Sequence, residues 1–286
     1  MTDSDWQPGP WDVTHDEYHA EHRWIGSSMA KSFDEHGPAW YREVYVDRTR
    51  PKSPPTEDML FGTAFHVALL QPELFEAQVA REPDGLNLRK PVDREVLAKW
   101  REMNAGKITL KSALFDQITP MLAATVACPA IRDILDLDGL VERGLRWRCS
   151  AADLGIPCKC LLDVLIGTSD GYTIYDVKTA KDTRPEPFAK QALNLGYLIS
   201  AAHYVEGIEQ ALGGGPVEFV WIVADKRPPY SEPRLYRLGR EELELGRKRR
   251  LEILTRMVDC YEYDDWFPAG YGEVQDLRFP RFAWTQ

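Results

Sequence analysis

The spacing of apolar residues changes once along the chain. Up to about residue 137 they follow helical spacing, whereas after residue 140 they alternate with polar residues or form short runs, as in β-strands. Helices are therefore expected at 26–45, split at Gly37, at 59–79, interrupted near Pro72, and in two pieces within 110–137. Strands are expected at 141–149, 158–167, 172–179, 217–225 and 234–239, with helices at 186–207 and 240–262.

This order of elements predicts an α/β protein with a central mixed β-sheet flanked by helices and a helical N-terminal part. We expect a single domain over residues 25–286, whose helical part covers 25–137 and whose sheet-containing core covers 138–286. Residues 1–24 contain three tryptophans without apolar periodicity. They are expected to form a loosely packed N-terminal arm.

Composition narrows the class of protein. The chain has 286 residues, 44% of them apolar, and a net charge of -10, values typical of a globular protein with no membrane span. The N-terminus is acidic and polar, unlike a secretory signal, and the five cysteines are an odd count that favours reduced thiols in the cytoplasm. The acidic balance still allows a local basic surface, and Arg89 and Lys90 open the first basic stretch.

The most informative pattern is the hairpin of the second and third predicted strands. If its loop is 168–171, Asp163 and Asp176 lie opposite each other with Cβ atoms roughly 4.5–5.5 Å apart, and Lys178 projects from the same face. Opposed carboxylates repel, so this register favours a divalent ion with hard oxygen ligands, Mg²⁺ or Mn²⁺. If the loop is only Asp170-Gly171, Asp163 faces Lys178 in an ordinary ion pair.

Asp163, Asp176 and Lys178 fit the acid, acid-X-Lys pattern of the PD-(D/E)XK nuclease superfamily. From about Ile25 to Trp284 the chain resembles its RecE-like branch, exodeoxyribonuclease VIII and its phage-encoded relatives. The segments that carry the likeness, in the family's order, are FGTAFHVALLQPELFE (61–76), CKCLLDVLIG (158–167), YDVKTAKD (175–182), YLISAAHYVEGI (197–208), ADKRPPY (224–230) and the aromatic tail (276–286).

The resemblance implies a restriction-endonuclease-like core with an Mg²⁺ or Mn²⁺ site. Its catalytic residues would be Asp163, Asp176 and Lys178, with Lys178 orienting or deprotonating the attacking water or stabilising charge on the phosphate. The metal ligands would be the two aspartates, His66 and the Val177 carbonyl, and a second metal is compatible with the pattern. Glu142 is a further candidate ligand. The alternative for Glu142 is a solvated strand end, and the alternative for His66 is a hydrogen-bonded histidine of the core.

The resemblance also implies contacts with substrate. Tyr197, Ser200 and Tyr204 follow one face of a predicted helix, where core packing is the alternative, and Arg89 and Lys90 are candidate phosphate contacts. The family has glutamine where this chain has Ser200, and arginine where it has Leu161. The basic run 247–250 is more typical of a solvated helix face or an oligomer contact.

The implied activity is 5′-to-3′ exonuclease action on the ends of linear double-stranded DNA, leaving 3′ single strands for recombination by a single-strand annealing protein. The resemblance also implies a ring-shaped homo-oligomer that acts in the cytoplasm of a bacterial or phage-infected cell and does not bind a membrane. Alternatives are a nuclease of the same fold on single-stranded DNA, flaps or RNA, and a non-catalytic DNA-binding module. No iron–sulfur cluster is expected, because Cys158 and Cys160 have one residue between them.

Overall fold

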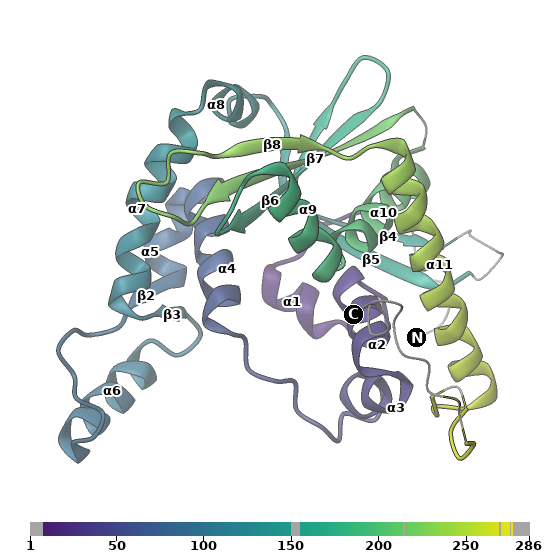
Figure 1. The fold of residues 1–286 in the computed structure, drawn as a ribbon, viewed down its shortest axis with the longest axis horizontal. Coiled ribbons are helices and arrows are strands. Elements are labelled where there is room, and N and C mark those ends of the chain that lie inside the picture. The colour runs from purple at the N-terminus through teal and green to yellow at the C-terminus, as the bar shows by residue number, and fades with distance from the viewer. Residues whose placement is uncertain (1–7, 150–154, 214, 269, 275, 277–286) are drawn as a thin grey trace, which may run out of the picture.

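A mixed six-stranded sheet forms the centre of the computed structural model, which describes residues 8–149, 155–213, 215–268, 270–274 and 276 (Figure 1). In spatial order its strands are β1 (Gly9–Trp11), β4 (Leu140–Arg148), β5 (Pro157–Gly167), β6 (Tyr172–Ala180), β7 (Val217–Asp225) and β8 (Arg234–Arg237). Within this sheet β6 and β7 run parallel and the other neighbours run antiparallel. The predicted α/β fold with a mixed, helix-flanked sheet is confirmed.

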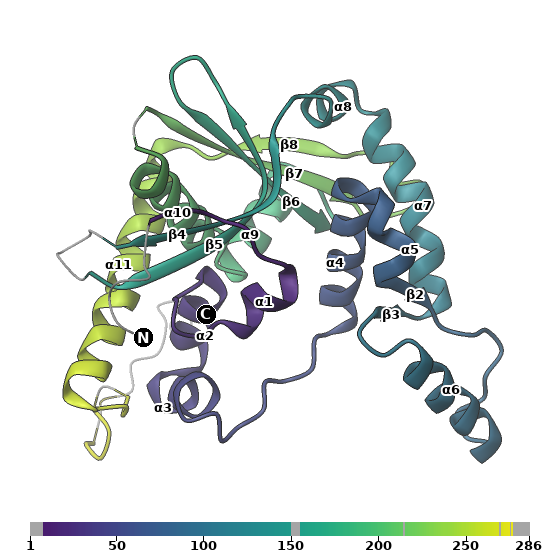
Figure 2. The ribbon, with the colours of Figure 1, turned by 180° about the vertical axis from the view of Figure 1, so that it is seen from behind.

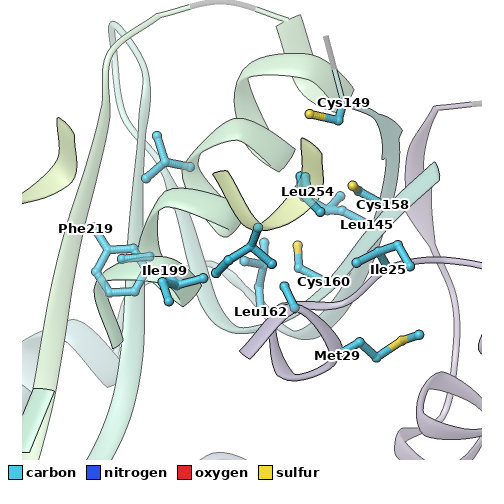
Figure 3. Packing of buried hydrophobic residues seen from close by; sticks show 14 of the residues in the cluster. Ile25, Met29, Leu145, Cys149, Cys158, Cys160, Leu162, Ile199, Phe219 and Leu254 are labelled. Carbon is cyan, nitrogen blue, oxygen red and sulfur yellow. The ribbon is translucent and has the colours of Figure 1, made fainter. Parts of the chain in front are cut away.

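Five helices pack on one face of the central strands β6 and β7. They are α2 (Ser27–His36), α3 (Pro38–Tyr41), α9 (Pro185–Asn194), α10 (Tyr197–Ile208) and α11 (Arg240–Tyr263). Their core cluster includes Ile174 of β6 and Trp221 of β7, and Figure 3 shows its buried side chains drawn from strands and helices together. Cys149, Cys158 and Cys160 belong to this cluster, and no disulfide joins any two cysteines in the described part of the chain.

A second core cluster lies on the opposite face, where α4 (Glu57–Leu70), α7 (Ser112–Ala127) and α8 (Pro129–Leu135) pack. It contains Val177 and Ile222, and the neighbours of Ile222 along β7, Trp221 and Val223, belong to the first cluster, as strand alternation requires. No single helix in the described part of the chain is long and apolar enough to cross a membrane; α7 and α8 pass that test together but meet at 95°.

A projecting unit follows α4 and reaches away from the sheet (Figure 2). It ends in α6 (Pro91–Met103), which carries Arg89 and Lys90 at its start. A parallel two-stranded sheet supports it. The remaining elements are α1 (His15–Ala20), a π-helical turn (Arg42–Val46), a 3-10 turn (Pro72–Leu74), α5 (Phe75–Gln78), β2 (Val79–Arg81), β3 (Ile108–Leu110) and a π-helical turn (Glu209–Gly213).

Two expectations about the elements are wrong. The N-terminal arm is not loosely packed over its described residues: β1 pairs with β4, and Tyr18 and Trp24 are buried. The helix expected at 186–207 is two helices, because Gly196 adopts a left-handed conformation with φ of +64° between α9 and α10. The aromatic tail after residue 276 lies outside the described residues.

The basic run 247–250 is not uniformly solvated, because Arg250 is 3% exposed. Its guanidinium donates to His203 Nδ1 over 2.9 Å, forms an ion pair with Glu206, and contacts the sulfur atoms of Cys149 and Cys158. His203 Nε2 donates a hydrogen bond to the Lys159 carbonyl, which connects the network to β5. This buried network joins α10 and α11 to the sheet.

We expect Arg250→Met to cost about 3–5 kcal/mol of unfolding free energy, because it leaves the Glu206 carboxylate buried without its partner. Arg249→Met, one residue earlier on an exposed side chain, should cost less than about 1 kcal/mol. Urea unfolding of both variants measures the difference. A loss in Arg250→Met as small as the one expected for Arg249→Met would show that the buried network adds little to stability.

Candidate metal centre

The candidate site lies where β5 and β6 part. The two strands pair from Gly167↔Tyr172 to Val164↔Tyr175, so the hairpin loop is 168–171, as in the first of the two registers considered. Continuing that register would pair Asp163 with Asp176, but the ladder ends one residue earlier. The Asp163 carboxylate instead accepts a hydrogen bond of 2.7 Å from the Val177 N–H. A side chain thus replaces a strand at this point of the sheet.

The Val177 carbonyl likewise forms hydrogen bonds to side chains. It accepts hydrogen bonds from His66 Nε2 over 2.7 Å and from Lys178 Nζ over 3.2 Å. Because a carbonyl only accepts, Nε2 carries a proton, and Nδ1 is the nitrogen that faces Asp163, 3.4 Å from its Oδ2. The carbonyl predicted as a metal ligand therefore orients His66 in this structure.

Helix α4 places His66. The helix is capped by the Thr56 hydroxyl, which accepts from the Met59 N–H. Phe61 and Phe65 are fully buried in the second cluster beside Val177. These aromatic anchors fix the helix against β6, so the imidazole meets the gap between the strands from the α4 face.

Glu142 joins His66 and Asp163 from β4. Ligand atoms of these three residues lie within 4.8 Å of one another. The β4–β5 ladder pairs Val141 and Arg143 but skips Glu142, whose φ of +48° is unusual for a residue with a side chain. Burial raises the pKa of Glu142 to about 8, and the charge of Asp163 adds to the shift.

Asp176 and Lys178 form a neighbouring ion pair on the other side of the gap. Asp176 is 4% exposed and is not among the three clustered ligands. Burial raises its pKa, with repulsion from Asp163 adding to the shift against the attraction of Lys178. Burial would lower the pKa of Lys178, but the charges of the two aspartates outweigh it and raise the pKa. Lys178 is therefore an ammonium at neutral pH.

The other predicted residues are spread over three environments. The ring of Tyr197 lies 5.3 Å from Lys178 Nζ, so this tyrosine belongs to the site. Tyr204 packs in the first core cluster, and Ser200 is 8% exposed. Arg89 and Lys90 are exposed and directly precede α6, the helix that Figure 1 shows reaching away from the sheet.

Gln191 is a site residue that the sequence did not indicate. Its amide donates to the Thr179 carbonyl over 3.1 Å and to the Tyr197 hydroxyl over 3.3 Å. It thereby fixes the tyrosine beneath Lys178. The sequence predicted one continuous helix and so gave no sign of this contact, because the turn at Gly196 brings Gln191 and Tyr197 together.

The donor set suits a divalent cation. Two carboxylates and one imidazole nitrogen converge on one place, and in the absence of a cation the carboxylates of Glu142 and Asp163 repel. Oxygen-rich ligand sets favour Mg²⁺ or Mn²⁺, and imidazole is acceptable to Mn²⁺. The three clustered residues therefore suit a divalent cation such as Mg²⁺ or Mn²⁺.

Known proteins share this fold. The family model described as "PDDEXK-like domain of unknown function (DUF3799)" matches residues 26–278. The solved structure of a "Putative exonuclease" from Eubacterium rectale has a TM-score of 0.60 at 15% identity, covering 96% of this chain and 98% of that one. At that identity the likeness shows the fold alone. A second solved structure, SSO0001, has a TM-score of 0.27 at 13% identity over 71% of this chain and 87% of that one, too low to carry an argument. No curated protein matches.

Glu142 makes the metal-free protein's stability depend on pH. Because its pKa is higher in the folded state than in the unfolded state, the protonated carboxyl stabilises the fold, and this stability is lost as pH rises from about 4.5 to about 8. We expect Glu142→Gln to raise the melting temperature in EDTA by roughly 2–4 °C at pH 8.5 and by much less at pH 5. Parallel melting curves across this range would contradict the raised pKa.

Proposed function

The chain belongs to the PDDEXK-like family DUF3799, and from this membership we propose that it is a metal-dependent nuclease. The observation that carries the proposal is the convergence of His66, Glu142 and Asp163 beside the Asp176–Lys178 pair. Acidic and imidazole ligands next to a protonated lysine match the needs of phosphodiester hydrolysis, which must bind a cation and offset charge on the phosphate.

In the proposed site His66, Glu142 and Asp163 hold the cation, and Asp176, whose charge acts on Asp163, is the further ligand that the acid-X-Lys pattern implies. A bound Mg²⁺ or Mn²⁺ lowers the pKa of water and polarises the phosphate. The Val177 carbonyl keeps Nδ1 of His66 directed toward the carboxylates. The Val177 N–H holds one oxygen of Asp163 in place.

Lys178 stabilises negative charge on the phosphate in this proposal. Its pKa is raised, so at neutral pH it has no lone pair with which to take a proton from water. Of the two roles considered for this lysine, electrostatic stabilisation therefore fits better. Tyr197 and Gln191 act as positioning residues, since the first lies against the ammonium and the second holds the tyrosine hydroxyl.

The RecE-like resemblance extends the proposal to the substrate. We propose 5′-to-3′ exonuclease action on linear double-stranded DNA, which leaves 3′ tails for a single-strand annealing protein. A homo-oligomeric ring in the cytoplasm of a bacterial or phage-infected cell is part of the same proposal. Arg89 and Lys90 are exposed and suit contacts to more distant phosphates.

Digestion of linear duplex DNA, labelled separately at the 5′ and 3′ ends, tests the activity. With Mg²⁺ or Mn²⁺ we expect release from the 5′ end and none in EDTA. Asp176→Ala and Lys178→Ala should lower the rate at least about 100-fold, because the first removes a proposed metal ligand and the second removes the positive charge that offsets the phosphate. Lys190→Ala, on an exposed lysine of α9, is the matched control and should cleave normally.

The result that overturns the exonuclease is an absence of cleavage with every metal. Retained DNA binding would then indicate a non-catalytic module. Leu161 and Ser200, where the chain differs from the RecE-like family, would be the positions that explain the missing activity. Cleavage confined to single strands, flaps or RNA would keep the nuclease and replace the substrate.

Metal binding is tested separately from activity. At 100 times its dissociation constant, a cation that binds the folded protein stabilises it by about 2.7 kcal/mol. We expect Mn²⁺ to raise the melting temperature of the wild type, and His66→Ala to lose most of that rise because it removes one of the three clustered ligands. An unchanged rise in the variant would place the metal elsewhere.

A further inference from the structure

Lys31 of α2 lies against the turn that joins α9 to α10. Its stem passes over Gly196, where an added Cβ atom would lie 2.8 Å from Lys31 Cδ and 3.3 Å from Cγ. Gly196 also has φ of +64°, so its conformation and its surroundings both favour glycine. The turn is shaped to let the lysine stem cross it.

The ammonium of Lys31 is sparsely paired. Its Nζ donates one long hydrogen bond of 3.4 Å, to the Leu195 carbonyl, and no carboxylate among the described residues forms an ion pair with it. An ammonium has three donors, so two are available to another acceptor. The side chain is partly exposed, which leaves it within reach of a ligand.

Lys31 and Lys178 approach the same turn. Tyr197, the residue after Gly196, has its ring 5.3 Å from Lys178 Nζ. Burial lowers the pKa of Lys31 to about 8, and the charge of Lys178 adds to the shift. The charges of Asp176 and Glu35 oppose it, so they offset part of the repulsion between the two lysines. Two cations held near each other repel, and an anion that binds between them relieves the repulsion.

A simpler role also exists for Lys31. Leu195 is at the C-terminal end of α9, where a cation stabilises the free carbonyl groups and the helix dipole. This role accounts for the hydrogen bond to Leu195. It leaves two donors of the ammonium unused, at a place where the charge of Lys178 repels Lys31 and the charge of Asp176 offsets that repulsion only in part.

We propose that Lys31 is a substrate-binding residue, which contacts a backbone phosphate next to the phosphate held at Lys178. The proposal rests on the proposed nuclease function. Its ligand is a phosphodiester of the nucleic acid backbone, so it adds affinity without sequence preference.

The test compares wild type with Lys31→Met, which keeps the stem over Gly196 and removes the charge, and with Lys31→Arg, which keeps the charge. Lys190→Met is the matched control, on an exposed lysine paired with Glu186. Affinity for a duplex with 5′-hydroxyl ends is measured in Ca²⁺ against salt concentration. Melting temperatures of all four proteins are measured alongside.

Losing one phosphate contact reduces the slope of log K against log salt by about 0.9, which weakens binding roughly 8-fold at 0.1 M salt. We expect this change in Lys31→Met, its recovery in Lys31→Arg, and neither change in Lys190→Met. A lower melting temperature with an unchanged salt slope in Lys31→Met would overturn the proposal and leave Lys31 as a helix cap. If wild type neither binds nor cleaves duplex DNA, the nuclease function itself fails, and this proposal with it.

Discussion

The parting of β5 and β6 at Val177 is the constraint on which the candidate site depends. The N–H and carbonyl of a residue in the middle of a sheet normally form hydrogen bonds to neighbouring strands. At Val177 the N–H goes to Asp163, and the carbonyl goes to His66 and Lys178. One residue's backbone therefore positions three functional side chains. Because Val177 itself is fully buried between α4 and the sheet, this reference point is rigid.

Several features around this point are unfavourable in isolation. Glu142 holds a left-handed backbone, its carboxyl is buried near Asp163, and Asp176 and Lys178 are withdrawn from water. Each such feature costs free energy of order 1–3 kcal/mol. The two core clusters on either side of the sheet supply the stability that keeps them in place. Their concentration at one gap supports a functional origin, since strain of this kind is not needed to build the sheet.

The sequence predicted the strands β5 and β6, because alternation along a strand is a local property. The structure has the hairpin loop 168–171 and keeps its register up to Val164, whereas the sequence left that loop and the shorter loop 170–171 both open. It did not predict that the ladder stops there, since this depends on His66, a residue 111 positions away from Val177. The pairing of Asp176 with Lys178 also went unforeseen, because strand alternation gives a shared face but no side-chain partner.

Other differences have the same origin in long-range packing. The helix 186–207 was expected to be continuous from its apolar spacing, yet Gly196 turns the chain there beneath Lys31. Gly207 was expected to end it, but α10 continues to Ile208. The glycine is there because an added Cβ atom would lie 2.9 Å from the Trp147 ring. Local rules identify a glycine as a breaker, whereas only the fold tells whether it serves conformation or close packing.

The residues that meet at the gap are widely separated along the chain, from α4 through β4 and β5 to β6, and β6 itself is completed by the later strand β7. A partly synthesised chain that ends after β6 contains these residues, but it lacks β7, the strand that pairs with β6 along its whole length. We therefore expect the site to take its final geometry during translation only after β7 has left the ribosome and can pair with β6. The proposed cation site would in this way form after the sheet that holds it, and not before.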